Sequence, residues 1–181
     1  MRLQITAVLF ASMAWPSCFA QTSNAITTPA KATSQESLYV PVHEFDSRRD
    51  AAADIRAAIA EAQRTRKRII LYIGGLWCPY CHQMDELFQK NPDLLQLRES
   101  RFITVAIHYG SGNNNDQALS TYTKVLGVPH FFVLESDGTL LHSQHVLDLR
   151  ADGAYSPAKI KEFLNRWAHA DHLEPDLANP N

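Results

Sequence analysis

The stretch Trp77-Cys78-Pro79-Tyr80-Cys81-His82 decides how the rest of the chain is interpreted. It follows the apolar run 69–73 (IILYI) and the pair Gly74-Gly75, and it opens a pattern typical of a helix. Two cysteines at this spacing suit three chemistries: a redox dithiol, half of a zinc site or, because His82 follows, covalent attachment of a c-type haem. The remaining sequence has to decide among them.

The composition predicts one globular domain. The chain has 181 residues, of which 45% are hydrophobic and 20% are charged, which is enough for one core plus unstructured ends. The formal net charge of −2 shows no basic excess of the kind that binds nucleic acids or anionic membranes. We therefore expect no nucleic-acid partner. Our prediction for the oligomeric state is a monomer.

The first twenty residues resemble a secretory signal peptide. Arg2 gives a positive start, Leu3 to Ala14 is mostly apolar, and Cys18-Phe19-Ala20 places small residues before an expected cleavage site. The apolar run is shorter than the ~20 residues that a membrane span needs. We predict a signal peptide over 1–20, export across the inner membrane and a periplasmic location. A lipid anchor on Cys18 is the weaker interpretation, because Trp15-Pro16-Ser17 is a poor approach to a lipidated cysteine.

After cleavage, Cys78 and Cys81 are the cysteines that remain. They lie too close together in sequence for their disulfide to close a useful loop, so the pair is not a structural staple of a small secreted scaffold. We therefore interpret the pair as chemically active.

Helices and strands alternate along the predicted domain, which spans 38–172 between a flexible Ser/Thr/Ala-rich leader (21–37) and a disordered polar tail (173–181). Continuous apolar runs predict buried strands, and two short runs across a turn predict a hairpin. The predicted elements are an edge strand at 38–42, a helix at 47–66 capped by Asp46, a strand at 68–73, helices from Pro79 and Asn91, a strand at 102–107, a helix at 116–126, a hairpin of 131–134 and 139–142, and a helix at 156–167.

Two motifs stand in an informative order. W-C-P-Y-C at 77–81 precedes a helix, and Val128-Pro129 heads the hairpin. Together they resemble the thioredoxin family, particularly its secreted bacterial members, over roughly Phe45 to Ala168. The resemblance implies an α/β thioredoxin fold, with a central mixed β-sheet flanked by helices. It also implies a cis peptide bond before Pro129, which brings this loop beside the cysteines.

The position of the cysteines predicts a thiol–disulfide oxidoreductase acting on protein thiols and disulfides. Cys78, at the start of a helix, faces unpaired N–H groups and the positive end of the helix dipole, which favour its thiolate. We expect it to be exposed and to attack a substrate disulfide, after which Cys81 displaces the substrate. Pro79 fits the first helical turn, where no N–H is missed.

The same stretch predicts a binding surface for an extended peptide. Trp77 and Tyr80 would form part of an apolar rim. Because Pro129 has no N–H group, a substrate strand would pair with the backbone of Val128 instead. A membrane electron donor or acceptor is a further partner that this chemistry would use.

The sequence also departs from the family. Pro79-Tyr80 is the pair that glutaredoxins carry, but the hairpin is not followed by the glycine pair and acidic residues that bind glutathione, so glutathione specificity is not expected. Thioredoxin has a buried aspartate six positions before its first cysteine, where this chain has Tyr72. The candidates for the proton acceptor of Cys81 are therefore water, His82, Glu86 and His130.

The haem and zinc alternatives each lack residues that the site would need. For a c-type haem, Met84 is the only methionine left after cleavage and lies too near His82 to bind the opposite face. For zinc, there is no second C-x-x-C and no histidine pair of the finger type. A non-catalytic binding or redox-sensing module is a third alternative. We expect an oxidoreductase without cofactor or metal, and the haem and module alternatives stay open.

Overall fold

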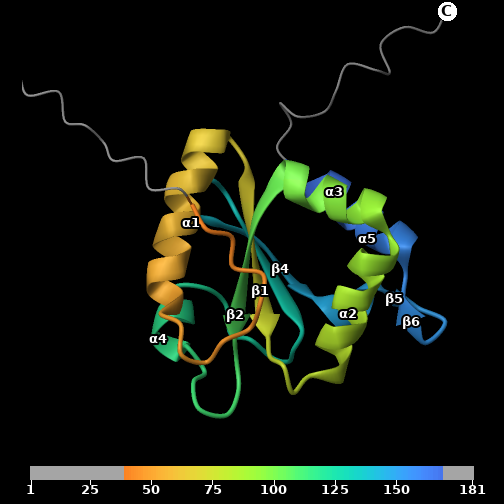
Figure 1. Ribbon diagram of the computed structural model, residues 1–181, viewed down its shortest axis with the longest axis horizontal. Coiled ribbons are helices and arrows are strands. Elements are labelled where there is room, and N and C mark those ends of the chain that lie inside the picture. The colour runs from red at the N-terminus through yellow and green to blue at the C-terminus, as the bar shows by residue number, and fades with distance from the viewer. Residues whose placement is uncertain (1–38, 169–181) are drawn as a thin grey trace, which may run out of the picture. The chain divides into compact units, whose positions relative to one another are not determined.

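A four-stranded sheet in the order β2-β1-β3-β4 forms the centre of the computed structural model, which describes residues 39–168 (Figure 1). β1 (Arg68–Gly74) pairs in parallel with β2 (Phe102–His108) and antiparallel with β3 (His130–Leu134). β3 in turn pairs antiparallel with β4 (Leu140–His145). This mixed sheet confirms the predicted α/β class. The predicted signal peptide, the leader, the tail and residues 169–172 of the predicted domain lie outside the described residues.

Helices cover both faces of the sheet (Figure 1). Successive side chains of a strand point to opposite faces, so β1 contributes Ile69, Leu71 and Ile73 to one core cluster and Ile70 and Tyr72 to the other. The helices are α1 (Ala51–Thr65) and α4 (Asp116–Leu119) on the first face, and α2 (Pro79–Lys90), α3 (Pro92–Arg101) and α5 (Pro157–Trp167) on the second. Both cysteines belong to the second cluster.

The central strand leads directly to the dithiol. Residues 69–73 are all buried, as the continuous apolar run predicts for a strand covered on both faces. β1 ends at Gly74, and α2 begins at Pro79. The cysteines therefore lie just after the carboxyl end of β1, one of the two inner strands of the sheet.

Two helices differ from their predicted bounds. α1 begins at Ala51, because the Asp50 side chain accepts a hydrogen bond from the Ala53 N–H at 3.0 Å and so caps the helix. Asp46, the predicted cap, forms an ion pair with Arg48 instead. α4 ends at Leu119 rather than at 126. Hydroxyl side chains after this point compete with the helix for backbone hydrogen bonds. The Ser120 hydroxyl, for example, donates to the Gln117 carbonyl at 2.7 Å.

The edges of the sheet also differ. The predicted strand at 38–42 is reduced, within the described residues, to an isolated parallel bridge between Val42 and Val105. β4 extends to His145, beyond its predicted end at 142. Three short elements between β4 and α5 were not predicted from the sequence. These are η1 (Val146–Leu149), β5 (Arg150–Ala151) and β6 (Ala154–Tyr155).

Arg68 ties the start of β1 to the end of α5. Its guanidinium donates to the carbonyls of Trp167 at 3.0 Å and Ala168 at 3.2 Å, and it pairs with Glu135 at 3.2 Å while its side chain is only 20% exposed. We expect Arg68→Met to lower the free energy of unfolding by about 1–3 kcal/mol, since partly buried carbonyls lose a charged donor. Urea denaturation would measure this loss.

The matched control is Arg166→Met. Arg166 pairs with Glu162 on the exposed face of α5, where both side chains are open to solvent. An exposed pair of this kind contributes about 0.5 kcal/mol or less. Equal losses in the two variants would contradict an anchoring role for Arg68.

Candidate active site

Cys78 is the N-cap residue of α2. Its Sγ accepts a hydrogen bond from the Cys81 N–H at 3.3 Å, and its carbonyl accepts one from the His82 N–H at 3.2 Å. Pro79 occupies the first helical position, as predicted. The sulfur of Cys78 therefore meets the unpaired N–H groups and the positive end of the helix dipole, an arrangement that stabilises a thiolate.

Both cysteines are nevertheless buried. Cys78 is 2% exposed and Cys81 is 1% exposed, so the expectation that Cys78 meets solvent is wrong. The first turn of α2 packs against the end of the sheet, which places both residues in one core cluster with Phe45 and Tyr72. The two sulfurs are those of free cysteines in this structure.

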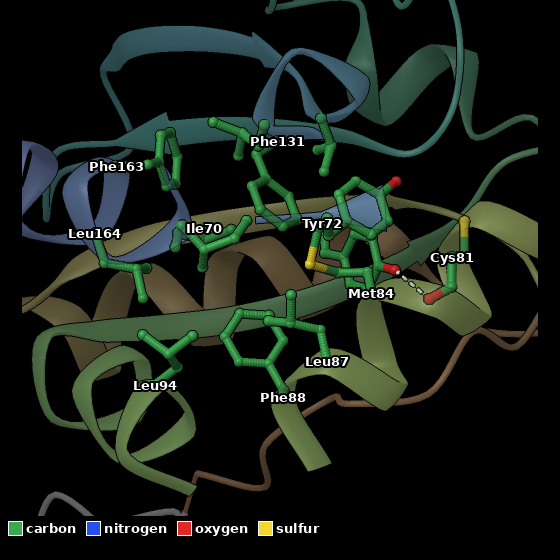
Figure 2. Packing of buried hydrophobic residues seen from close by; sticks show 14 of the residues in the cluster. Ile70, Tyr72, Cys81, Met84, Leu87, Phe88, Leu94, Phe131, Phe163 and Leu164 are labelled. Atoms are coloured by element: carbon green, nitrogen blue, oxygen red, sulfur yellow. Dashed lines mark hydrogen bonds between the residues drawn. The ribbon is translucent and has the colours of Figure 1, made fainter. Parts of the chain in front are cut away.

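Cys81 lies over the last residue of β1. A Cβ added at Gly74 would be only 2.6 Å from the Cys81 Sγ, so the missing side chain at Gly74 leaves room for the thiol. The Tyr72 hydroxyl donates to the Cys81 carbonyl at 3.1 Å (Figure 2). Burial, and next the neighbouring Cys78, raise the pKa of the Cys81 thiol to about 12.

Asp85 is a site residue that the sequence analysis missed. It is half-buried on α2, one turn after Cys81, and burial raises the pKa of its carboxyl. Arg98, His82 and the Tyr72 hydroxyl oppose that rise, so they lie near this carboxylate. The available signal was the spacing: residues four apart share a helix face, and Asp85 stands four after Cys81.

The three predicted proton-handling side chains are not gathered at Cys81. Glu86 is exposed and pairs with Lys90 at 2.9 Å. His82 is exposed, and its Nε2 lies 2.7 Å from the Leu76 carbonyl, so the ring braces the loop before the dithiol. Of the three, His82 lies near the Asp85 carboxylate.

His130 lies on the face of β3 that points away from the cysteines. Its ring packs against Phe132 at 4.7 Å between centroids, and Phe132 belongs to the cluster beneath α1. Its Nε2 lies 2.8 Å from the Ser143 hydroxyl. Burial, followed by His145 and His142, lowers the pKa of His130 to about 4. Because side chains alternate along a strand, the His130 ring lies on the opposite face of the sheet from Cys81.

The predicted rim residues are exposed. Trp77 is 56% exposed and Tyr80 is 41% exposed. The Trp77 indole lies against Gly75 and Gly110, where an added Cβ would collide with it. These two glycines therefore set the position of the largest side chain beside the dithiol.

The Arg150 side chain packs against Tyr80, one of the two rim residues. The Arg150 guanidinium lies over the rings of Tyr80 at 4.9 Å and Tyr155 at 5.2 Å. It also donates to the Gln83 side chain at 2.8 Å and to the Gly153 carbonyl. The short β5–β6 hairpin, which the sequence did not predict, is thereby joined to the helix that carries the cysteines.

The Val128–Pro129 peptide bond is cis, the isomer that the resemblance implies. Pro129 is buried, and Val128 packs against the core cluster that contains both cysteines. Val128 thus lies beside the core that encloses both cysteines.

Two negative findings apply to residues 39–168. They hold no group of three or more His, Cys, Asp or Glu side chains that could bind a metal ion. Within the same range, none of the helices has the length and apolar character needed to cross a membrane.

Comparisons with known proteins agree with this geometry. Residues 50–136 match a family model described as thioredoxin-like. A disulphide isomerase from Xylella fastidiosa Temecula1 matches with a TM-score of 0.59 at 25% identity, over 67% of this chain and 93% of that one. The oxidised C-terminal domain of Neisseria meningitidis DsbD matches with a TM-score of 0.48 at 21% identity, over 65% of this chain and 93% of that one.

A search of curated protein sequences gave no match. The thioredoxin-like fold is therefore supported by the family model, the mixed sheet and the placement of the cysteines. The described residues have a thioredoxin-like fold, with the Cys78/Cys81 pair at the start of its α2 helix.

Proposed function

We propose that this protein is an enzyme, a thiol–disulfide oxidoreductase that exchanges disulfides with other proteins through Cys78 and Cys81. The observation that carries the proposal is the placement of the Cys78 Sγ at the cap of α2, 3.3 Å from the Cys81 N–H. Since the thiolate is the attacking species in disulfide exchange, a site that stabilises it favours this reaction. The similarity to a disulphide isomerase supports the same reaction class.

The exchange takes place in two steps. The Cys78 thiolate attacks one sulfur of a substrate disulfide, forming a mixed disulfide and releasing the other substrate sulfur as a thiolate. Cys81, one helical turn further on, then attacks the Cys78 sulfur and displaces the remaining substrate sulfur. The pair is oxidised to a disulfide while the substrate disulfide is reduced, and each step can run in reverse.

The surface around the pair fits a protein substrate. Leu76, Trp77 and Tyr80 expose apolar and aromatic surface next to the cysteines. Such side chains bind extended segments with large contact area and low entropic cost. The backbone of Val128, which precedes buried Pro129, would pair with the substrate strand. We infer that the substrates are flexible cysteine-containing segments rather than glutathione.

We also propose that the protein works after export, in the periplasm, with a membrane protein as its electron donor or acceptor. The support is the signal-peptide pattern in residues 1–20. Disulfides form and persist in such an oxidising compartment. Cell fractionation of the full chain with a C-terminal tag would test this, and a tagged protein retained in the cytoplasm at full length would contradict it.

An insulin reduction assay tests the enzyme proposal. We expect the wild-type protein to accelerate the reduction of insulin by dithiothreitol, because its dithiol relays electrons between the two. A variant with both Cys78 and Cys81 replaced by serine is the control and should give the uncatalysed rate. Equal rates with the two proteins would favour a non-catalytic binding module.

A further inference from the structure

A short hairpin with a well-defined turn precedes α5. Asp152 and Gly153, which join β5 to β6, both have positive φ angles, of 51° and 81°, as a tight two-residue turn requires. The two strands place Arg150 directly opposite Tyr155. Behind the hairpin, the Lys159 side chain of α5 donates to the Arg150 carbonyl at 2.8 Å. The backbone of Arg150 is therefore fixed by the turn on one side and by α5 on the other.

The side chain of Arg150 reaches from this hairpin to α2, which lies beside it (Figure 1). Its guanidinium carbon is 4.9 Å from the centre of the Tyr80 ring, and its Nη1 donates to the Gln83 side chain at 2.8 Å. A cation within ~6 Å of an aromatic ring is attracted to the face of that ring. Tyr80 stands between the two cysteines in sequence. Arg150 therefore holds Tyr80 in position and adds a positive charge to the rim of the dithiol.

This charge has no carboxylate partner among residues 39–168. Arg150 forms none of the ion pairs found within that range at a distance of 4.0 Å or less. Its hydrogen bonds go to neutral acceptors, the Gln83 amide and the Gly153 carbonyl. A guanidinium has five N–H groups, which is more than these two acceptors use. The side chain can therefore donate to oxygen atoms of another molecule.

The acidic residues of the neighbouring elements do not neutralise this cation. Glu86 of α2 pairs with Lys90 at 2.9 Å. Asp148 faces the end of β4, where it lies within 3.4 Å of a side-chain amide. Asp152 lies at the exposed turn of the hairpin and makes no ion pair with Arg150 either. A carboxylate that approaches over the exposed rim would therefore meet an unpaired guanidinium.

We propose that Arg150 is a specificity-determining residue, which binds a carboxylate of the substrate close to the cysteine that reacts. The preferred substrates are then flexible segments in which an Asp or Glu stands beside the disulfide-bonded cysteine. The segment lies on Tyr80, and its carboxylate accepts hydrogen bonds from the guanidinium, whose planar fork matches a carboxylate. This inference rests on the proposed oxidoreductase function. Since Arg150 would not touch the reacting sulfur atoms, its contact should lower KM and leave kcat nearly unchanged.

Three disulfide-bonded peptides test the proposal. They are identical except for one residue beside the cysteine, which is Asp, Asn or Lys, and dithiothreitol drives their reduction by the protein. We expect the wild-type kcat/KM to be about fivefold higher for the Asp peptide than for the Asn peptide, as for a partly exposed ion pair, with the difference in KM. The Lys peptide should react more slowly than the Asn peptide. The preference should shrink in about 0.5 M salt, which screens exposed charges.

Variants of Arg150 separate recognition from a structural effect. Arg150→Gln should react equally well with the Asp and Asn peptides. Arg150→Lys should keep a smaller preference for Asp, because the charge remains but the planar fork is lost. Arg150→Glu should prefer the Lys peptide. Each variant is compared with itself on the three peptides, so a general loss of activity does not change the ratio.

The matched control is Lys90→Gln. This variant removes a cation from the last turn of α2, at the opposite end of the helix from the cysteines. It should keep the wild-type preference for the Asp peptide. A preference that falls as much in Lys90→Gln as in Arg150→Gln would show an effect of net charge alone and would overturn the inference.

The remaining outcomes distinguish this inference from the proposed function. If the wild type reduces insulin but reacts equally with the three peptides, the role of Arg150 is wrong while the proposed function stands. If Arg150→Gln slows all three reactions by the same factor and keeps the preference for Asp, Arg150 has only a structural role. If the wild type reduces neither insulin nor the peptides, the proposed function fails, and the inference fails with it.

Discussion

Replacing Cys78 by serine is expected to abolish insulin reduction, whereas replacing Cys81 by serine should leave the protein trapped in mixed disulfides. The reason is the order of attack. Cys78 stands at the cap of α2, before the first helical turn, while Cys81 is enclosed between Tyr72 and Gly74. A chain without Cys81 can still attack a substrate but has no second thiol to release it.

Non-reducing gels of protein incubated with oxidised substrate measure the trapped species. The Cys81→Ser variant should show a band that disappears with dithiothreitol, and the Cys78→Ser variant should show little of it. The double serine variant is the control for adventitious pairing. Equal trapping by the two single variants would mean that Cys81 also attacks substrates, and the assignment of roles would be wrong.

Gly74→Ala is expected to have the second large effect, on both stability and catalysis. The added Cβ would stand 2.6 Å from the Cys81 Sγ and 2.8 Å from Phe45 Cζ, both of which lie in the core. Overpacking of a close-packed core costs about 1–3 kcal/mol. Relief of the collision moves the Cys81 sulfur, so the Cys78–Cys81 disulfide should also form more slowly.

Thermal melting and the rate of disulfide formation measure the two effects of Gly74→Ala. Gly127→Ala is the matched control for stability. Its added Cβ would be 3.1 Å from the tip of the His145 side chain, which can shift because it is partly exposed. An alanine at position 74 that leaves both stability and disulfide formation unchanged would show that the Cys81 sulfur is not confined by β1.

The parts of the fold that the sequence predicted correctly are those with a strong local signal. β1 and β2 are continuous apolar runs, and Asn91-Pro92 and Ser156-Pro157 open helices because proline fits the first helical turn. α4 was overestimated because the apolar spacing continues after Leu119, while the hydroxyl side chains there compete for backbone hydrogen bonds.

The site was predictable where function depends on neighbours in sequence. The capping position of Cys78 and the place of Pro79 follow from the motif itself. Burial of Cys78 did not, because it depends on how α2 packs against the end of the sheet. Glu86 was predicted as a candidate proton acceptor and Asp85 was not, although Asp85 shares the helix face of Cys81 and Glu86 does not.

Contacts between segments far apart in the chain could not be predicted from the sequence. Arg150 reaches Tyr80 only because the two-residue strands β5 and β6 turn the chain back toward α2. Strands of that length carry no hydrophobic period. The position of His130 followed from strand register, since a shift by one residue would have placed its ring on the cysteine face.

Because Cys78 and Cys81 are buried, only some molecules can reach their sulfur atoms. A dissolved oxidant such as peroxide must pass the rim before it meets the sulfur of Cys78, so irreversible oxidation to sulfinic acid is disfavoured. A disulfide held inside a rigid, folded protein is excluded for the same steric reason. A disulfide on a flexible segment can be led past Trp77 and Tyr80 to the sulfur. We therefore expect incompletely folded chains to exchange disulfides with this protein faster than fully folded ones.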